Sequence, residues 1–310
     1  MTGPKNEQAI LDYTSPLDYE NLMNSVQFLS DRYPFLAVTY MGTSILGRGI
    51  PMLSIGDGSQ KSVLYVGCHH GMEWITTAIL LRFANELCEA IATGRRMYSV
   101  NLPNVLRTRT LHIIPQLNVD GANIQIHGAE DCILRERLIS MNGGDDFSHW
   151  QANARGVDLN HNYDAGFFKY KKIEAEAGIM GGGPTRFSGE LPESEPEVAS
   201  LCSLLRYSEN ISMVLTLHSQ GEEIYYTSGG KTAPKAATIA RLMSKMCGYK
   251  LAEPEGMASY GGLTDWCIGE LNLPSFTIEC GKGENPLPLS SYFEIYAALR
   301  EMLFTAPILA

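Results

Sequence analysis

The sequence predicts a single α/β domain whose mixed, mostly parallel β-sheet is covered by helices on both faces. Short apolar runs alternate with longer amphipathic segments along the 310 residues, as strands and helices do in folds of this class. No internal repeat, low-complexity tract or long polar linker interrupts the alternation. We therefore expect one domain over residues 1–310, with a short N-terminal extension at residues 1–12.

The N-terminal half supplies the first predicted elements. Apolar residues at helical spacing predict a helix over residues 16–33, with Ser15 as its N-cap. Glycine-rich turns separate three short apolar runs, which predict strands at 37–40, 52–55 and 63–67. A long amphipathic helix over 73–91 and a strand at 110–116 follow.

The C-terminal half continues the same pattern after a polar interruption. Residues 131–148 are polar and irregular and are expected to form a long surface loop. The elements expected beyond this loop are a helix around 201–205, a strand at 212–217, a helix at 236–247, a strand at 275–279 and a closing helix at 290–303. Binding sites usually collect at the carboxyl ends of parallel strands, so the residues that follow these strands are the candidates for function.

Composition excludes several classes of partner. The formal net charge of −10 argues against nucleic acid and anionic membranes, which require a basic face. Seven scattered cysteines without a CxxC pair favour a reducing compartment. The first residues contain no apolar signal segment, and no stretch reaches the length of a membrane span. A cytoplasmic protein is expected.

The first candidate site follows the predicted strand at 63–67. There His70 and Glu73, three residues apart, leave a strand and enter a helix. An imidazole nitrogen and a carboxylate oxygen are normal zinc ligands. Alone the pair is a weak signal, because a solvated histidine beside a glutamate at a helix N-terminus has the same pattern.

Two further strand ends strengthen the metal hypothesis. The strand at 212–217 ends at His218, and the apolar run at 275–278 ends at Glu279. Together with the first pair, these side chains form two histidines and one carboxylate around an open fourth position, plus a second carboxylate able to take a proton. The pattern predicts a catalytic zinc site.

The chain resembles the zinc carboxypeptidase family related to carboxypeptidase A along nearly its whole length. The segments that carry the resemblance are GTSILGRGIPMLSIG, HGMEWIT, NVDG, GVDLNHNYD, SEPE, LHSQ, YGGLTDW and FTIE. By this resemblance His70 begins the metal motif, and His69 is its neighbour rather than a ligand. So many matching fragments, in the same order as in the family, are a highly specific sign of membership.

The resemblance implies a role for each matched residue. One Zn²⁺ per chain would be held by His70, Glu73 and His218, with Glu279 as the general base. Asp158 matches the carboxylate that supports the first histidine ligand and fixes its tautomer.

The sequence departs from the family pattern at its arginines. The Asn-Arg pair that binds a terminal carboxylate is Asn160-His161 here, and the arginine of the metal motif is Met72. The arginine that polarises the scissile carbonyl aligns with Gln151, and nearby Arg155 is a candidate replacement. Loss of the carboxylate clamp argues against an ordinary exopeptidase.

Other positions could compensate for these losses. The family's phenolic tyrosine aligns with Met257, which leaves Tyr260 as the nearest candidate. Lys282 and Arg186 could supply the missing positive charge.

Three segments resemble a particular branch of the family, the bacterial γ-D-glutamyl-L-diamino acid endopeptidases. These segments are ANARGVDLNHNYDAGF, HSQGEEIYY and TIECGKGENPLPL. The resemblance implies cleavage between D-glutamate and meso-diaminopimelate or lysine in peptidoglycan peptides (muropeptides), with His161 and Lys282 meeting the carboxylates of the diamino acid. Two alternatives stay open: an ordinary carboxypeptidase with a remodelled carboxylate pocket, and a non-catalytic peptide-binding protein. No feature of the sequence predicts the oligomeric state.

Overall fold

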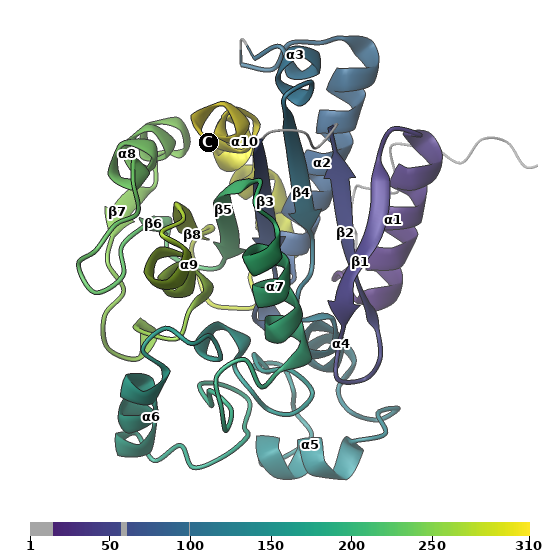
Figure 1. Ribbon diagram of the computed structural model, residues 1–310. Coiled ribbons are helices and arrows are strands. Elements are labelled where there is room, and N and C mark those ends of the chain that lie inside the picture. Colours follow the sequence, from purple (N-terminus) through teal and green to yellow (C-terminus); the bar gives the residue numbers. More distant parts are fainter. Residues whose placement is uncertain (1–14, 57–60, 99) are drawn as a thin grey trace, which may run out of the picture.

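The computed structural model describes residues 15–56, 61–98 and 100–310 (Figure 1). The expected extension at 1–12 lies outside the described residues. One sheet of eight strands runs through the described part of the chain, in the order β1-β2-β4-β3-β5-β8-β6-β7. The strands are β1 (Ala37–Thr43), β2 (Gly49–Ile55), β3 (Lys61–Gly67), β4 (Arg109–Ile114), β5 (Ile211–His218), β6 (Glu223–Tyr225), β7 (Lys250–Ala252) and β8 (Ser275–Glu279).

The centre of the sheet is parallel. β4, β3, β5 and β8 pair in parallel, whereas β1 with β2, β2 with β4, and β6 with β8 pair antiparallel. Every residue of β3 after Lys61 is buried, which explains its continuous apolar run, because a central parallel strand is covered on both faces. The predicted mixed sheet is confirmed, and the carboxyl ends of β3, β5 and β8 share one edge.

Helices cover both faces of this sheet. In Figure 1, α7 and α9 lie over the face nearest the viewer, and α2 and α10 lie behind it. The helices are α1 (Tyr19–Arg32), α2 (Ile75–Thr93), α3 (Leu102–Leu106), α4 (Val119–His127), α5 (Arg135–Asn142), α6 (Phe167–Glu176), α7 (Pro196–Tyr207), α8 (Ala236–Cys247), α9 (Leu263–Leu271) and α10 (Tyr292–Leu309). In the described ranges no helix is both long enough and apolar enough to cross a membrane.

The core behind the sheet joins three elements through aromatic side chains. Tyr65 of β3 packs against Phe83 of α2 at 5.1 Å between ring centroids, and Phe83 meets Phe304 of α10 at the same distance. The buried Tyr65 hydroxyl donates to the Leu303 carbonyl at 2.9 Å. β3, which leads into His70, is thereby packed against α2 and α10.

Two local expectations were wrong. The first helix begins at Tyr19 and is capped by Asp18, whose carboxylate accepts from the Asn21 amide at 2.8 Å, so Ser15 is not the cap. A carboxylate is an effective N-cap, and proline at 16 favours an extended residue before it. Part of the expected loop at 131–148 is helix α5, in which Leu138 alone is buried. Because a helix with one buried residue has almost no apolar periodicity, the sequence showed no sign of α5.

Candidate metal centre and substrate pocket

Three side chains from two of the central strands converge at the carboxyl edge of the sheet. His70 follows β3 and precedes the 3₁₀ turn Gly71–Glu73, and His218 is the last residue of β5. His70 Nδ1 lies 2.9 Å from Glu73 Oε1, and His218 Nδ1 lies 3.1 Å from Glu73 Oε2. The two Nδ1 atoms are 3.4 Å apart. Two nitrogens and a carboxylate thus face a common point, as required of a metal site.

The spacing fits zinc. Donor atoms bound tetrahedrally at about 2.0–2.1 Å lie about 3.3 Å from one another. Among the described residues, His218 Nδ1 is the nitrogen recorded near the buried Glu73 Oε2, and their contact lacks hydrogen-bond geometry, as expected of two atoms that face a cation. Burial raises the pKa of Glu73, but His70 and His218 outweigh burial and bring this pKa down to about 2. The carboxylate is therefore ionised, as a zinc ligand must be.

Close backbone approach positions the turn that carries His70. A Cβ atom on Gly71 would lie 2.4 Å from the carbonyl oxygen of Gly121 in α4, so no larger residue fits at position 71. The Asn118 side chain caps α4 at Gly121 and also donates from Nδ2 to the His69 carbonyl at 3.0 Å. The NVDG segment thus holds the turn that carries His70 and Glu73 against α4.

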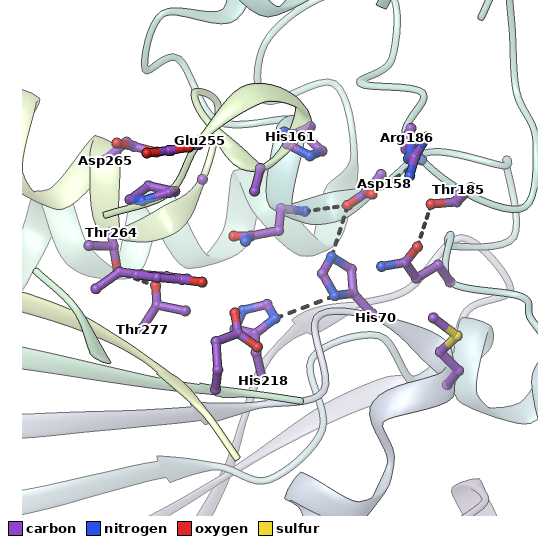
Figure 2. Close-up of a pocket in the computed structure, with 18 of the residues that line it drawn as sticks. His70, Asp158, His161, Thr185, Arg186, His218, Glu255, Thr264, Asp265 and Thr277 are labelled. Atoms are coloured by element: carbon purple, nitrogen blue, oxygen red, sulfur yellow. Dashed lines mark hydrogen bonds and ion pairs between the residues drawn. The ribbon is translucent and has the colours of Figure 1, made fainter. Parts of the chain in front are cut away.

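Asp158 fixes the orientation of His70. Its Oδ1 lies 3.1 Å from His70 Nε2, and its Oδ2 accepts from the Arg186 backbone amide at 3.2 Å (Figure 2). A histidine that donates one ring N–H to a carboxylate presents the other nitrogen as a lone pair. The structure brings Asp158 to the position expected from the sequence. Burial lowers the pKa of His70, but Glu73 and Asp158 outweigh burial and hold this pKa well above its usual value.

His69 lies behind the three converging side chains. Its Nε2 lies 3.0 Å from the Tyr163 hydroxyl and its Nδ1 lies 3.2 Å from Thr216 Oγ1. The ring stacks on His218 with centroids 5.1 Å apart. With both ring nitrogens engaged and its pKa lowered well below the usual value by burial, His69 packs as a neutral support for His218.

Asn285 contacts Glu73, which the sequence did not predict. Its Nδ2 lies 3.5 Å from Glu73 Oε1 and donates to the Ser219 carbonyl at 2.5 Å. The Ser219 hydroxyl donates back to Asn285 Oδ1 at 2.8 Å. Asn285 therefore ties Glu73 to the residue after His218. It lies in GENP, shortly after the Glu279 strand end, but an asparagine in a loop carries no distinctive signal.

Glu279 lies beside His218 because of strand register. In the parallel pairing of β5 with β8, His218 is directly opposite Glu279. Burial and the nearby Glu73 carboxylate raise the pKa of Glu279 to about 8. A carboxyl group with a pKa near neutrality is suited to both accepting and returning a proton.

These groups open onto a cavity of about 500 Å³ (Figure 2). Asn160, His161 and Gln151, which were expected to contact substrate, line it. Asn160 Oδ1 accepts from the Leu263 amide at 3.1 Å. The His161 ring stacks on Tyr170 at 3.8 Å, and burial lowers the pKa of His161. Where the family has a permanent cation, this pocket therefore has a histidine that is neutral at neutral pH.

Three other expected contacts do not line this cavity. The guanidinium of Arg155 lies 3.8 Å from Glu195 Oε1, and Lys282 Nζ lies 2.5 Å from Glu222 Oε2. The ring of Tyr260 packs under the ammonium of Lys169 at 5.5 Å, and the Tyr260 carbonyl lies 2.9 Å from His161 Nδ1. Tyr260 thus contributes to the pocket indirectly, by orienting His161.

The pocket includes several side chains that the sequence did not single out as substrate contacts. They are His149, Thr185, Tyr225, Thr227, Glu255, Thr264, Asp265 and Thr277. Arg186, one of the two possible sources of positive charge, also lines it. In Figure 2, Arg186 lies on the side of His70 and Asp158, and Glu255 and Asp265 lie together on the opposite side. The cavity therefore offers a cation on one side and carboxylates on the other.

Comparison with known proteins agrees with this geometry. The family model described as zinc carboxypeptidase matches residues 22–300. Gamma-D-glutamyl-L-diamino acid endopeptidase 1 of Lysinibacillus sphaericus is 36% identical over 90% of this chain and 69% of its own length. Carboxypeptidase B of Bos taurus is 25% identical over 82% of this chain and 60% of its own length. The crystal structure of carboxypeptidase A from Helicoverpa armigera superposes with a TM-score of 0.72 at 20% identity, covering 96% of this chain and 74% of that one. The chain belongs to the zinc carboxypeptidase family and is a zinc metallopeptidase.

Proposed function

We propose that this enzyme hydrolyses the amide bond between a γ-D-glutamyl residue and an L-diamino acid, meso-diaminopimelate or lysine, in short peptidoglycan-derived peptides. The Lysinibacillus relative, whose name states this activity, supports the proposal by its 36% identity over 90% of the chain. The observation that carries it is the histidine, His161, at the position where family exopeptidases use an arginine for the terminal carboxylate. A pocket without that fixed clamp is suited to cleavage within a chain.

The charges around the pocket favour a diamino acid. Arg186 on one side suits a carboxylate, because a guanidinium pairs with carboxylates in a fork. Glu255 and Asp265 on the other side suit an ammonium group. A diamino acid carries both kinds of group on one short skeleton.

The proposed roles follow from the contacts. His70, Glu73 and His218 hold the zinc, and Asp158 keeps His70 in the tautomer that presents Nδ1. When bound, zinc acts as a Lewis acid and lowers the pKa of a water molecule to about 7. Asn160 and His161 contact the peptide from the pocket wall.

Glu279 moves the protons in the proposed reaction. Its carboxylate accepts a proton from the attacking water, whose oxygen forms a bond to the scissile carbonyl carbon. The same carboxyl group then gives this proton to the diamino acid nitrogen as the C–N bond breaks. The products are a γ-D-glutamyl carboxylate and a free amine.

A defined tetrapeptide, L-Ala-γ-D-Glu-meso-diaminopimelate-D-Ala, tests the substrate. We expect mass spectrometry to find diaminopimelyl-alanine as a product, with no release when zinc is chelated. Stepwise loss of C-terminal residues from simple peptides would instead identify an ordinary carboxypeptidase. Tight binding of muropeptides without turnover would identify a binding protein.

We also propose that residues 1–310 act as one catalytic domain and that the enzyme works in the cytoplasm. The seven cysteines, all free thiols and mostly buried, support a reducing compartment. Cell fractionation with an antibody against the chain tests the location, and recovery in an extracellular fraction would contradict it.

A further inference from the structure

The reaction needs a donor for the negative charge that develops on the scissile oxygen, and the arginine expected for this task is absent. We propose that the Gln151 side-chain amide donates this hydrogen bond and that Thr185 holds the amide in place. The inference rests on the proposed peptidase function and adds a catalytic residue and a positioning residue to it.

The backbone of Gln151 is fixed beside the metal-binding turn. Its carbonyl accepts from the Gly71 amide at 2.8 Å and from Asn118 Nδ2 at 3.2 Å. Its own amide donates to the Pro184 carbonyl at 2.8 Å. Gly71 follows the ligand His70, and Pro184 precedes Thr185. The Gln151 backbone therefore links the turn that carries His70 to the segment that carries Thr185.

The side chain is oriented by a single hydrogen bond. Thr185 Oγ1 donates to Gln151 Oε1, and both residues line the cavity together with His70 (Figure 2). A primary amide has one acceptor oxygen and two N–H donors. Because the oxygen is engaged by Thr185, the group that remains available to a ligand is the NH₂. Across the described residues, no protein acceptor is recorded for it.

Other side chains of the pocket could donate, and Arg186 and His149 are two of them. Arg186 is exposed, and within the described part of the chain its guanidinium has no recorded hydrogen bond or ion pair that would hold it in position. His149 lines the pocket but has no contact in the described chain that would fix its ring. Stabilisation of a developing charge depends on donors that are already in position. Gln151, like Asn160, is held at both its backbone and its side-chain oxygen, and the Gln151 backbone is bonded directly to the turn that carries His70.

The first test replaces the donor and its support separately. Gln151→Glu keeps the size and the acceptor oxygen but removes both N–H groups, and we expect kcat to fall about 10²–10³-fold with KM within a factor of about three. Thr185→Val should lower kcat about tenfold, and Thr185→Ser, which keeps the hydroxyl, should recover most of it. Because Thr185 acts through Gln151, the double variant Gln151→Glu/Thr185→Val should be no slower than Gln151→Glu alone.

Binding provides a second readout. A phosphinic peptide, whose tetrahedral phosphorus and oxygens imitate the transition state, should bind Gln151→Glu more weakly by about the factor lost in kcat/KM, whereas a product peptide should bind as before. Zinc content and melting temperature should stay at wild-type values. Thr93→Val, which removes a hydroxyl at the end of α2, is the control and should change neither kcat nor binding.

The outcomes distinguish this inference from the substrate proposal. All rates are measured on whichever peptide the wild type cleaves, so a different preferred bond would overturn the substrate and leave this test intact. Unchanged kcat in Gln151→Glu, or a loss confined to KM, would overturn the oxyanion role. A double variant much slower than Gln151→Glu would overturn the positioning role of Thr185.

Discussion

Glu279 pairs with His218 in strand register yet stands outside the group of three side chains that converge on one point. Its carboxylate can therefore be altered without removing a ligand. We expect Glu279→Gln to lower kcat about 10²–10⁴-fold, the range that general acid–base groups contribute. Metal analysis of the purified variant should find the same zinc content as in the wild type. A variant that turns over at the wild-type rate would exclude Glu279 as the base.

Glu197 gives the stability of the protein a distinct pH dependence. This buried carboxyl group lies in the first turn of α7, where Asn153 Nδ2 is 3.5 Å from its Oε2. Burial first, and then the neighbouring Asp120 and Glu195 carboxylates, raise its pKa from the usual 4.5 to about 8. The folded state thus keeps a proton that the unfolded state releases. The stability from this proton is complete below pH 4.5 and is lost as the pH rises toward 8.

Glu197→Gln, which cannot ionise, tests this effect. The free energy of unfolding of the variant, relative to the wild type, should rise between pH 5 and pH 8 by up to about 1.4 kcal/mol per pH unit. Urea titrations of zinc-saturated protein at several pH values measure it. Glu193→Gln, which removes a partly exposed ion pair with Arg206, is the control and should show a nearly constant difference of about 1 kcal/mol or less. The prediction would be contradicted if the free energy of unfolding had the same pH dependence in the wild type and in Glu197→Gln.

At the scale of elements, we expect the contact between the 3₁₀ turn Gly71–Glu73 and α4 to decide whether the candidate metal site forms. A methyl group at position 71 would press on the Gly121 carbonyl, which is backbone and cannot move alone. Gly71→Ala should therefore displace the turn that carries His70 and Glu73, destabilise the protein by about 1–3 kcal/mol and weaken zinc binding.

Calorimetry and a competing chelator measure both effects of Gly71→Ala. Gly144→Ala is the matched control, since a Cβ at position 144 meets nothing within 4 Å. The control should melt within a degree or two of the wild type. Equal zinc affinity in Gly71→Ala and the wild type would show that the turn tolerates the methyl group.

The elements that the sequence predicted well are those with strong apolar patterns. The strand at 275–279 and the helix at 236–247 have the predicted bounds, because buried faces leave continuous or periodic runs. β6 and β7 are three residues each and were not predicted. Such short strands are defined by their partners rather than by their own composition.

At the scale of the whole molecule, zinc should act as a cross-link between segments far apart in the chain. Its expected ligands follow β3 and end β5, and a ligand that binds only the folded state stabilises it by about 4 kcal/mol at a concentration 1,000 times Kd. Removal of zinc should therefore lower the melting temperature by several degrees. Differential scanning calorimetry with and without chelator measures the change. The melting temperature of His218→Ala should no longer depend on zinc, whereas that of Glu279→Gln should still depend on it. Equal melting temperatures of the wild type with and without zinc would argue against a metal site in the folded state.

Without the family resemblance, which supplied Asp158, Asn160, His161 and Gln151, the candidate site was predictable only near the ends of strands. His70, His218 and Glu279 could be singled out because a polar ligand directly after an apolar run is unusual, and parallel strands bring their ends together. Thr185 and Asn285 lie in long segments without periodicity, so their approach to Gln151 and Glu73 depends on tertiary contacts that no local pattern records. Loss of the family arginines was visible in the sequence, and of the two replacements expected from it, Arg186 lines the pocket and Lys282 does not.

The two oxygens of Asp158 have different partners, and this has a consequence for exchange of the ion. One oxygen faces the His70 imidazole and the other accepts from the backbone of Arg186, so a single carboxylate connects the pocket rim to the histidine. A peptide that draws the 185–186 segment inward would tighten the carboxylate against the imidazole. Zinc should then dissociate more slowly from protein saturated with an uncleavable peptide than from protein without peptide. A zinc-chelating dye in excess measures both dissociation rates.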